Sequence, residues 1–165
     1  MSYLKAVSTS ANCRTLVSQC YTNESALVKD CFKIIKENSR LPINLEVPIL
    51  GNYADMVYFH AGRIIAIEFK LTNLSAGLNQ ASRHLRVCNL SYVCITPRRI
   101  TRRIYELFKE RGVGLLFAAT EIKWPFVVAI SARYQKSRWL QLQQRTLSYI
   151  KTETGCLGAS DDQRQ

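Results

Sequence analysis

The stretch YADMVYFHAGRIIAIEFK, residues 53–70, decides the fold of this chain of 165 residues. Two runs rich in β-branched and aromatic residues begin within it, at 53–60 and 63–71. Such runs predict strands, and the Ala-Gly-Arg segment at 61–63 predicts a tight turn between them. The stretch therefore predicts an antiparallel hairpin.

The flanking sequence extends this hairpin into a mixed sheet covered by helices. A strand at 45–50, with Pro48 indicating an edge position, completes a three-strand antiparallel meander. Helical spacing of apolar residues predicts a preceding helix at 22–38, capped by Thr22 or Asn23. Strands that are joined through helices pair in parallel, so we expect an α/β fold. The later elements are helix 75–89, strand 91–96, helix 98–112 ended by Gly112, strand 113–119, an optional strand 125–131 and helix 133–153.

Composition indicates one domain. With 47% hydrophobic residues, a chain of 165 residues can bury one sizeable core. We expect a single domain over 1–165, with its core at about 22–150, an unassigned segment at 1–20 and a disordered tail at 155–165. No apolar run approaches the roughly 20 residues of a membrane span, and residues 1–14 lack a secretory signal. A cytoplasmic protein without membrane association is therefore expected.

The cysteines also favour a cytosolic protein. The chain has six cysteines and two histidines, and no two cysteines form a C-x-x-C pair. Zinc sites need clustered Cys and His ligands, so a zinc site is disfavoured. A chain of this size folds without disulfides, and reduced thiols in a cytosolic protein are the simplest interpretation.

The charge of the chain is uneven. The formal net charge is +11, and residues 97–151 contribute +9 of it, from twelve Lys or Arg and three Glu. A basic excess in one segment favours a polyanionic partner, most often nucleic acid. The alternative is a solvated basic surface without a partner.

Two carboxylates and a lysine are expected to converge at one end of the hairpin. Side chains alternate between the faces of a strand, so Glu68 and Lys70 share a face. A turn centred on Gly62 brings Asp55 opposite position 69, give or take one. Converging carboxylates favour a divalent cation such as Mg²⁺, beside which a lysine can act on water and phosphate. The alternative is a surface salt bridge between Glu68 and Lys70 on a solvated sheet face.

The triplet E-x-K alone is weak, because it recurs at 121–123 without an aspartate in a preceding hairpin strand. With Asp55, however, the pattern becomes D-x12-E-x-K, which resembles the motif of the PD-(D/E)xK nuclease superfamily and its restriction-endonuclease-like fold. The resemblance covers about residues 22–120. The proline of the family name is absent, since Tyr53 and Ala54 precede the aspartate.

The resemblance implies a Mg²⁺-dependent nuclease, in which Mn²⁺ can substitute. Asp55, Glu68 and the backbone carbonyl of Phe69 would bind the metal, and Lys70 would act on the water and the scissile phosphate. DNA is favoured over RNA as the substrate through the resemblance alone. Dimers are common in the superfamily, which leaves a homodimer or a larger complex open.

Three further side chains are candidates for the site. Glu24 corresponds to the acid that many members carry on the first helix, although a carboxylate there also suits the helix dipole. Gln80 corresponds to the glutamine of a Q-x-x-x-Y motif, but His84 stands in place of the tyrosine and is interpreted as a helix-surface residue. Glu46 is a spare carboxylate that we expect to face water.

Basic residues supply a candidate nucleic-acid interface at the start of the helix at 98–112. Cations oppose the dipole at a helix N-terminus, so phosphate contact explains them better than local stability does. The alternative is surface charge paired with Glu106 and Glu110. In the last helix Tyr134 and Trp139 could stack on bases, but the leucines nearby favour a core position for Trp139. The four interface candidates are Arg98, Arg99, Arg102 and Arg103.

Three functions are consistent with these patterns. The first is the metal-dependent nuclease. The second is a nucleic-acid-binding module or subunit on the same fold that does not cleave. The third is a protein-interaction domain whose basic face meets an acidic partner.

Overall fold

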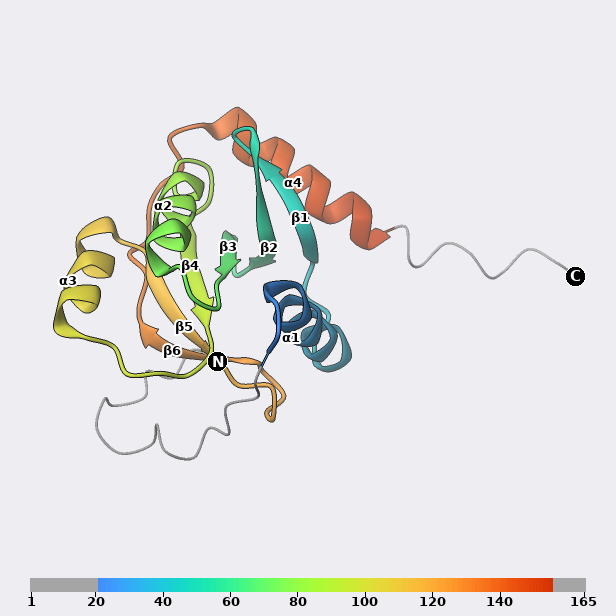
Figure 1. Ribbon diagram of the computed structural model, residues 1–165. Helices are drawn as coiled ribbons and strands as arrows, with labels where there is room; N and C mark the ends of the chain where they lie inside the picture. Colours follow the sequence, from blue (N-terminus) through green and yellow to red (C-terminus); the bar gives the residue numbers. More distant parts are fainter. Residues whose placement is uncertain (1–20, 156–165) are drawn as a thin grey trace, which may run out of the picture.

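The computed structural model describes residues 21–155, and the side chains of 21–152. A six-stranded sheet forms the middle of the molecule, and four helices surround it (Figure 1). The elements are, in order, α1 (Glu24–Asn38), β1 (Ile43–Ile49), β2 (Asn52–His60), β3 (Arg63–Phe69), α2 (Leu74–His84), β4 (Leu90–Ile95), α3 (Arg102–Arg111), β5 (Gly114–Ala118), β6 (Phe126–Ile130) and α4 (Leu140–Gly155).

The sheet is mixed, as the alternation of elements predicts. Its strands lie in the order β1-β2-β3-β4-β5-β6. Strands β1, β2 and β3 form an antiparallel meander, β3, β4 and β5 pair in parallel, and β6 returns antiparallel to β5. Helices α2 and α3 make the crossovers that parallel pairing requires. The predicted α/β fold class is confirmed, and the optional strand at 125–131 exists as β6.

The β2–β3 hairpin has a two-residue turn. Ala61 and Gly62 both adopt positive φ angles (49° and 76°), as a turn matching the strand twist requires. The register pairs Met56 with Ile67, and one step further along the two strands Asp55 lies opposite Glu68. The hairpin therefore sets the two carboxylates side by side.

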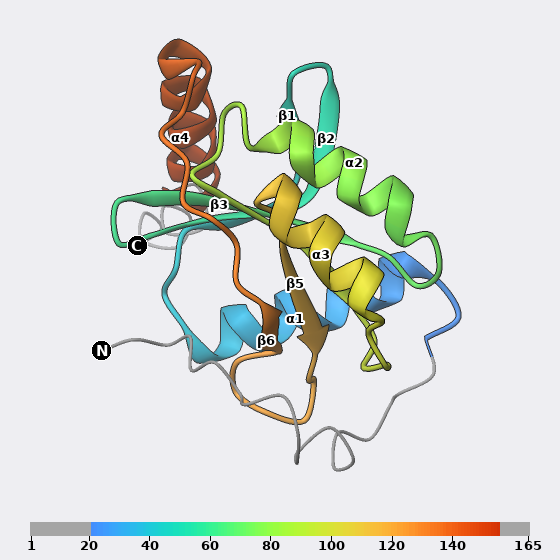
Figure 2. The same ribbon diagram turned by 90° about the vertical axis from the view of Figure 1, so that its left-hand side faces the viewer.

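The core lies on both faces of the sheet. Helix α1 covers one face, where Leu27 and Ile35 pack with Met56 and Phe69. Helices α2 and α3 cover the other face (Figure 2), and Phe108 of α3 joins the cluster on that side. Helix α4 packs against β1 and β2.

Two helix boundaries differ from the prediction. Helix α3 begins at Arg102 rather than at residue 98, because Thr101 is extended and its side chain caps the helix by accepting from Ile104 N at 3.4 Å. Helix α2 ends at His84, so Cys88 lies beyond it and packs in a different cluster from Leu78.

The segment 133–139 is irregular rather than helical, and α4 starts only at Leu140. Backbone bonds to other segments replace helical ones: Gln135 N donates to Asn89 O at 2.9 Å. The core position expected for Trp139 is wrong, since this side chain is 49% exposed. Tyr134 is also exposed.

Some of the predicted features lie wholly or partly outside the residues that the structure describes. Cys31, Cys88 and Cys94 are buried and free, whereas Cys13, Cys20 and Cys156 lie outside those residues. Segment 1–20 and the tail at 155–165 also lie outside them, apart from Gly155 at the end of α4. Between residues 21 and 155, no helix has both the length and the apolar character that a membrane span needs.

Candidate active site

Asp55 and Glu68 form the acidic centre of the site. Glu68 is fully buried on β3, and Asp55 is half-buried beside it on β2. The Phe69 amide donates to Asp55 Oδ2 at 2.7 Å, which fixes that carboxylate against the end of β3. The hairpin thus brings the two predicted acids together.

Glu68 has one oxygen held and one free. His84 Nε2 lies 2.6 Å from Glu68 Oε1, and because a carboxylate can only accept, the imidazole donates from Nε2. Across the described residues, Glu68 Oε2 finds no hydrogen-bond partner although it is buried. Lys70 Nζ lies 4.0 Å from this oxygen. A buried carboxylate oxygen without a hydrogen bond is costly, and a water molecule or a cation at this position would satisfy it.

Lys70 completes the predicted triad. Its side chain is 13% exposed, and Nζ lies 3.2 Å from Glu24 Oε2. A Cβ added at Gly77 on α2 would lie 2.7 Å from Lys70 Cγ, so the helix passes directly over the lysine stem. The absent side chain at Gly77 leaves room for this lysine.

Glu24 joins the site from the first turn of α1. Besides the ion pair with Lys70, its Oε1 accepts from Leu71 N at 3.1 Å. The helix dipole also favours a carboxylate at this position, as the alternative proposed. The contacts across 46 and 47 residues of sequence nevertheless make Glu24 part of the constellation.

The electrostatics of the site are those of crowded acids. Burial, together with the charge of Glu68, raises the pKa of Asp55 to about 6. The Phe69 N–H and the charge of Lys70 oppose this rise, and Glu24 adds to it. A cation placed between Asp55 and Glu68 would relieve the repulsion.

The donor set fits a hard divalent cation. Within residues 21–152, no group of three or more His, Cys, Asp or Glu side chains is arranged to hold a metal. Mg²⁺ needs fewer, because it binds through one or two carboxylates plus water and phosphate oxygens. Asp55, the free Oε2 of Glu68 and the Phe69 carbonyl are the oxygens that could hold it. A zinc-type cage is not formed by these residues.

Gln80 and His84 lie on the side of α2 that faces the site. Positions 77, 80 and 84 follow helical i, i+3 and i+7 spacing, and the first and last of these contact Lys70 and Glu68. Gln80 is half-buried at the position between them. The interpretation of His84 as a surface residue is wrong, since it is 1% exposed.

The four arginines of the predicted interface separate into two kinds. Arg98 is half-buried and donates from Nη1 to Leu71 O at 3.3 Å, while its buried Nη2 finds no partner among the described residues. Arg99, Arg102 and Arg103 are exposed, and Arg102 pairs with Glu106 at 2.8 Å. Arg98 thus belongs to the loop beside Lys70, whereas the other three lie at the surface. Glu46 is exposed, as expected.

Comparisons with known proteins add only the fold. No family model and no curated protein matches the sequence. Among solved structures the chain is similar to the SPO1766 protein of unknown function from Silicibacter pomeroyi. The TM-score is 0.53 at 16% identity, over 88% of this chain and 98% of that one. The similarity supports the arrangement of helices and strands, and it carries no statement about activity.

Proposed function

We propose that this protein is a Mg²⁺-dependent nuclease of the PD-(D/E)xK type that hydrolyses phosphodiester bonds, with DNA as the favoured substrate. The observation that carries the proposal is the unpaired, buried Oε2 of Glu68, which lies 4.0 Å from Lys70 Nζ and beside Asp55. The salt bridge between Lys70 and Glu68 is long, so it leaves Oε2 without a hydrogen bond and open to a further ligand.

The acids have distinct roles in this proposal. Asp55 and Glu68 would hold the cation, with the Phe69 carbonyl as a third oxygen, and His84 keeps Glu68 oriented through its hydrogen bond to Oε1. A bound Mg²⁺ supplies Lewis-acid stabilisation of the phosphoryl group and lowers the pKa of water. Glu24 orients the lysine through its 3.2 Å contact.

Lys70 acts on the reacting groups. Its ammonium can hydrogen-bond both the attacking water and a phosphate oxygen, and it stabilises the negative charge that develops in the transition state. The water oxygen forms the new bond to phosphorus, the bond to the leaving oxygen breaks, and protons exchange with solvent. Gln80 lies on the same side of α2 and is positioned to contact the phosphate.

The exposed arginines before and in α3 extend this site toward the nucleic-acid backbone. Arg99, Arg102 and Arg103 are solvent-exposed cations that can contact phosphates flanking the cleaved bond. Such contacts position the strand without reading its sequence.

Cleavage assays test the proposal. Wild type and Lys70→Ala are incubated with supercoiled plasmid and single-stranded DNA, in Mg²⁺, Mn²⁺ or EDTA. Cleavage by wild type that requires metal and is lost in Lys70→Ala supports the nuclease. Metal-independent binding without cleavage on every substrate contradicts it and indicates the non-cleaving module instead. No binding to nucleic acid at low salt contradicts both.

A further inference from the structure

A second feature lies at the opposite end of the sheet from the acidic centre. Residues 131–139, which connect β6 to α4, form a strap across the ends at which β4 and β5 begin. Three backbone N–H groups fasten it to carbonyls just before those strands, Arg133 to Gly112 and Gln135 to Asn89, both at 2.9 Å, and Arg138 to Arg86 at 3.2 Å. Buried Ser137 adds a bond from Oγ to Arg86 O at 3.3 Å.

The strap presents large apolar side chains to solvent. Tyr134 is 54% exposed, Trp139 is 49% exposed, and Leu140 at the start of α4 is 57% exposed. Burial of aromatic rings stabilises folding strongly, so their exposure at neighbouring positions on a fastened segment indicates a surface that contacts a partner.

The charge of the same segment identifies the kind of partner. From Ser131 to Arg145 the sequence carries Arg133, Lys136, Arg138 and Arg145, and no Asp or Glu. None of these cations is paired with a carboxylate within the described part of the chain. The Arg133 guanidinium donates from Nη2 to Lys109 O at 3.3 Å. Cations without a carboxylate partner, interleaved with aromatic rings, complement a polyanion that also has flat apolar faces.

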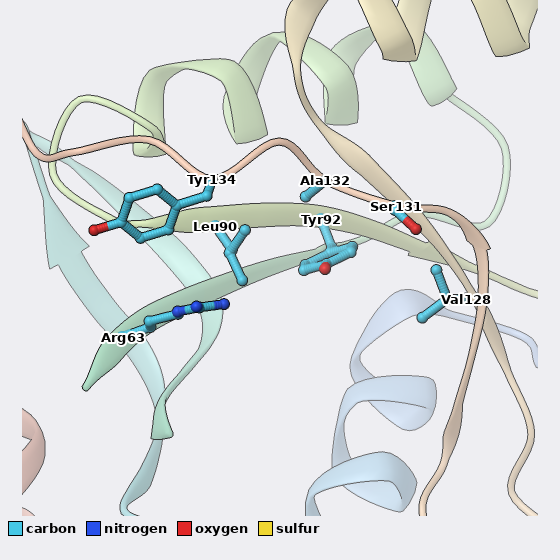
Figure 3. Close-up of a pocket in the computed structure, with 7 residues that line it drawn as sticks. All are labelled: Arg63, Leu90, Tyr92, Val128, Ser131, Ala132 and Tyr134. Atoms are coloured by element: carbon cyan, nitrogen blue, oxygen red, sulfur yellow. The ribbon is translucent and has the colours of Figure 1, made fainter. Parts of the chain in front are cut away.

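Arg63, at the start of β3, extends this surface. Its guanidinium lies 5.2 Å from the ring centroid of Tyr134. The two residues stand at one end of a cavity of about 200 Å³, with Ser131 and Val128 at the other end and the Tyr92 ring between (Figure 3). Aromatic side chains stack on unpaired bases, and an arginine beside them adds cation–π attraction and a positive charge for phosphate.

We propose that the strap, with Arg63, is a binding surface for single-stranded nucleic acid. Unpaired bases stack on Trp139 and Tyr134, and phosphates contact Arg133, Lys136 and Arg138. A duplex fits less well, because paired bases do not expose the ring faces that these aromatics need.

This surface is separate from the proposed nuclease centre. Along β3, Arg63 and Glu68 are five residues apart, which corresponds to roughly 17 Å. Binding at the strap requires neither metal nor cleavage, so it can be present or absent whatever the acidic centre does.

Fluorescence anisotropy tests the proposal with the full chain in EDTA. The probe is a labelled 20-nucleotide oligothymidine, compared with a 20-base-pair duplex. We expect Trp139→Ala to weaken binding of the oligothymidine about tenfold or more, and Tyr134→Ala to act in the same direction. The matched control is Tyr149→Ala, which removes an exposed tyrosine of α4 outside the strap, and we expect it to leave binding unchanged.

The salt dependence tests the cations separately. The double variant Lys136→Gln/Arg138→Gln is expected to reduce the slope of log K against log salt by about 1.4, since each phosphate contact to a single strand contributes about 0.7. An unchanged slope would contradict contact between these side chains and phosphates.

Tryptophan emission gives a direct signature of stacking. The chain has two tryptophans, and Trp124→Phe leaves Trp139 as the sole reporter. Oligothymidine should quench its emission with the same midpoint as the anisotropy. If Trp124→Phe does not fold, Trp139→Phe makes the converse test, because quenching should then disappear.

Four results would overturn the proposal: Trp139→Ala binds like wild type, the salt slope of Lys136→Gln/Arg138→Gln is unchanged, saturating oligothymidine leaves the Trp139 emission unchanged, or the protein binds anionic phosphatidylserine vesicles but no oligothymidine. Because metal is absent from these measurements, a failed strap and a failed nuclease are told apart. A protein that cleaves DNA but passes none of these tests retains the first proposal and loses the second.

Discussion

His84 Nε2 and Glu68 Oε1 are 2.6 Å apart in an environment from which solvent is excluded, with the two side chains 1% and 0% exposed. The bond fixes one oxygen of the carboxylate and leaves Oε2 without a hydrogen bond among the described residues, with Lys70 Nζ 4.0 Å away. His84 therefore acts on the site through Glu68. It is a positioning residue in the proposed nuclease rather than a group that touches the reacting atoms.

We expect His84→Ala to raise the Mg²⁺ concentration for half-maximal cleavage about 10- to 100-fold, the usual cost of losing a partner of a metal-binding side chain. The free energy of unfolding of this variant should also be about 3 kcal/mol lower than that of the wild type, because the buried Glu68 carboxylate loses its partner. His84→Gln restores a donor and should recover most of the metal affinity. Mn²⁺ binding, followed by electron paramagnetic resonance without nucleic acid, measures that affinity independently of turnover.

His60→Ala is the control for these variants, since His60 lies at the far end of β2. A purely structural role for His84 predicts that Ala and Gln variants lose stability while the Mn²⁺ affinity of the folded fraction stays constant. That result would contradict the positioning role.

Gly77→Ala tests whether the lysine stem needs the open space beneath α2. The new methyl group would lie 2.7 Å from Lys70 Cγ and 3.1 Å from Val93 Cγ1. Alanine favours the helix by about 1 kcal/mol over glycine, which offsets the crowding in stability. We therefore expect cleavage to fall at least about tenfold, as misplacement of a catalytic group does, while the melting temperature changes little. Ser75→Ala, exposed on the same helix, should preserve activity, and full activity in Gly77→Ala would contradict the close fit.

The pH dependence of stability follows from Asp55. Its pKa is raised from 3.8 to about 6 in the folded chain, mainly by burial. Between about pH 4 and pH 6 the folded state therefore binds more protons than the unfolded state. The contribution of Asp55 to the free energy of unfolding falls as pH rises through this range. Asp55→Asn keeps an acceptor for the Phe69 N–H and removes this loss. In EDTA, we expect the variant to gain about 3 kcal/mol at pH 7.5 and little near pH 4.

Urea unfolding at several pH values measures this difference, with Asp30→Asn, on the exposed side of α1, as the control. Mg²⁺ should stabilise the wild type at pH 7.5 by binding the folded state, and should have a smaller effect on Asp55→Asn. A difference between wild type and Asp55→Asn that is the same at every pH would show that the carboxylate is not destabilised by its surroundings.

The sequence was sufficient to predict the hairpin and its acids, because both depend on local rules. Apolar alternation decides which face each side chain occupies, and a short turn decides the register. The predicted register differs by one position from the observed one, in which Asp55 comes beside Glu68 rather than opposite residue 69. The observed register lies within the predicted range of one position on either side of residue 69, and Asp55, Glu68 and Lys70 converge as predicted.

His84 and the strap depend on contacts that are distant in sequence. His84 follows Gly77 and Ala81 at helical spacing, a signal that could have placed it on the buried side of α2. The leucines after Trp139 favoured a core position, but the strap is fastened to Asn89 and Gly112, segments that no local pattern connects with it. Those tertiary bonds hold 133–139 in an irregular, non-helical conformation, and the Trp139 indole remains exposed.

Truncation of Arg98 should affect stability and truncation of Arg102 should affect binding, although both residues were predicted to contact nucleic acid. Arg98 bonds Leu71 O, and Leu71 N is held by Glu24, so Arg98→Ala should loosen the loop after Lys70. We expect it to lose about 1–2 kcal/mol of unfolding free energy and to lower the cleavage rate. Arg102→Ala breaks only an exposed pair with Glu106, so stability should change by less than about 0.5 kcal/mol. Its effect should be on duplex binding, where the salt slope falls by about 0.9. Equal stability losses in the two variants, or an unchanged slope in Arg102→Ala, would contradict this division between an arginine that supports the site and one that contacts the phosphate backbone.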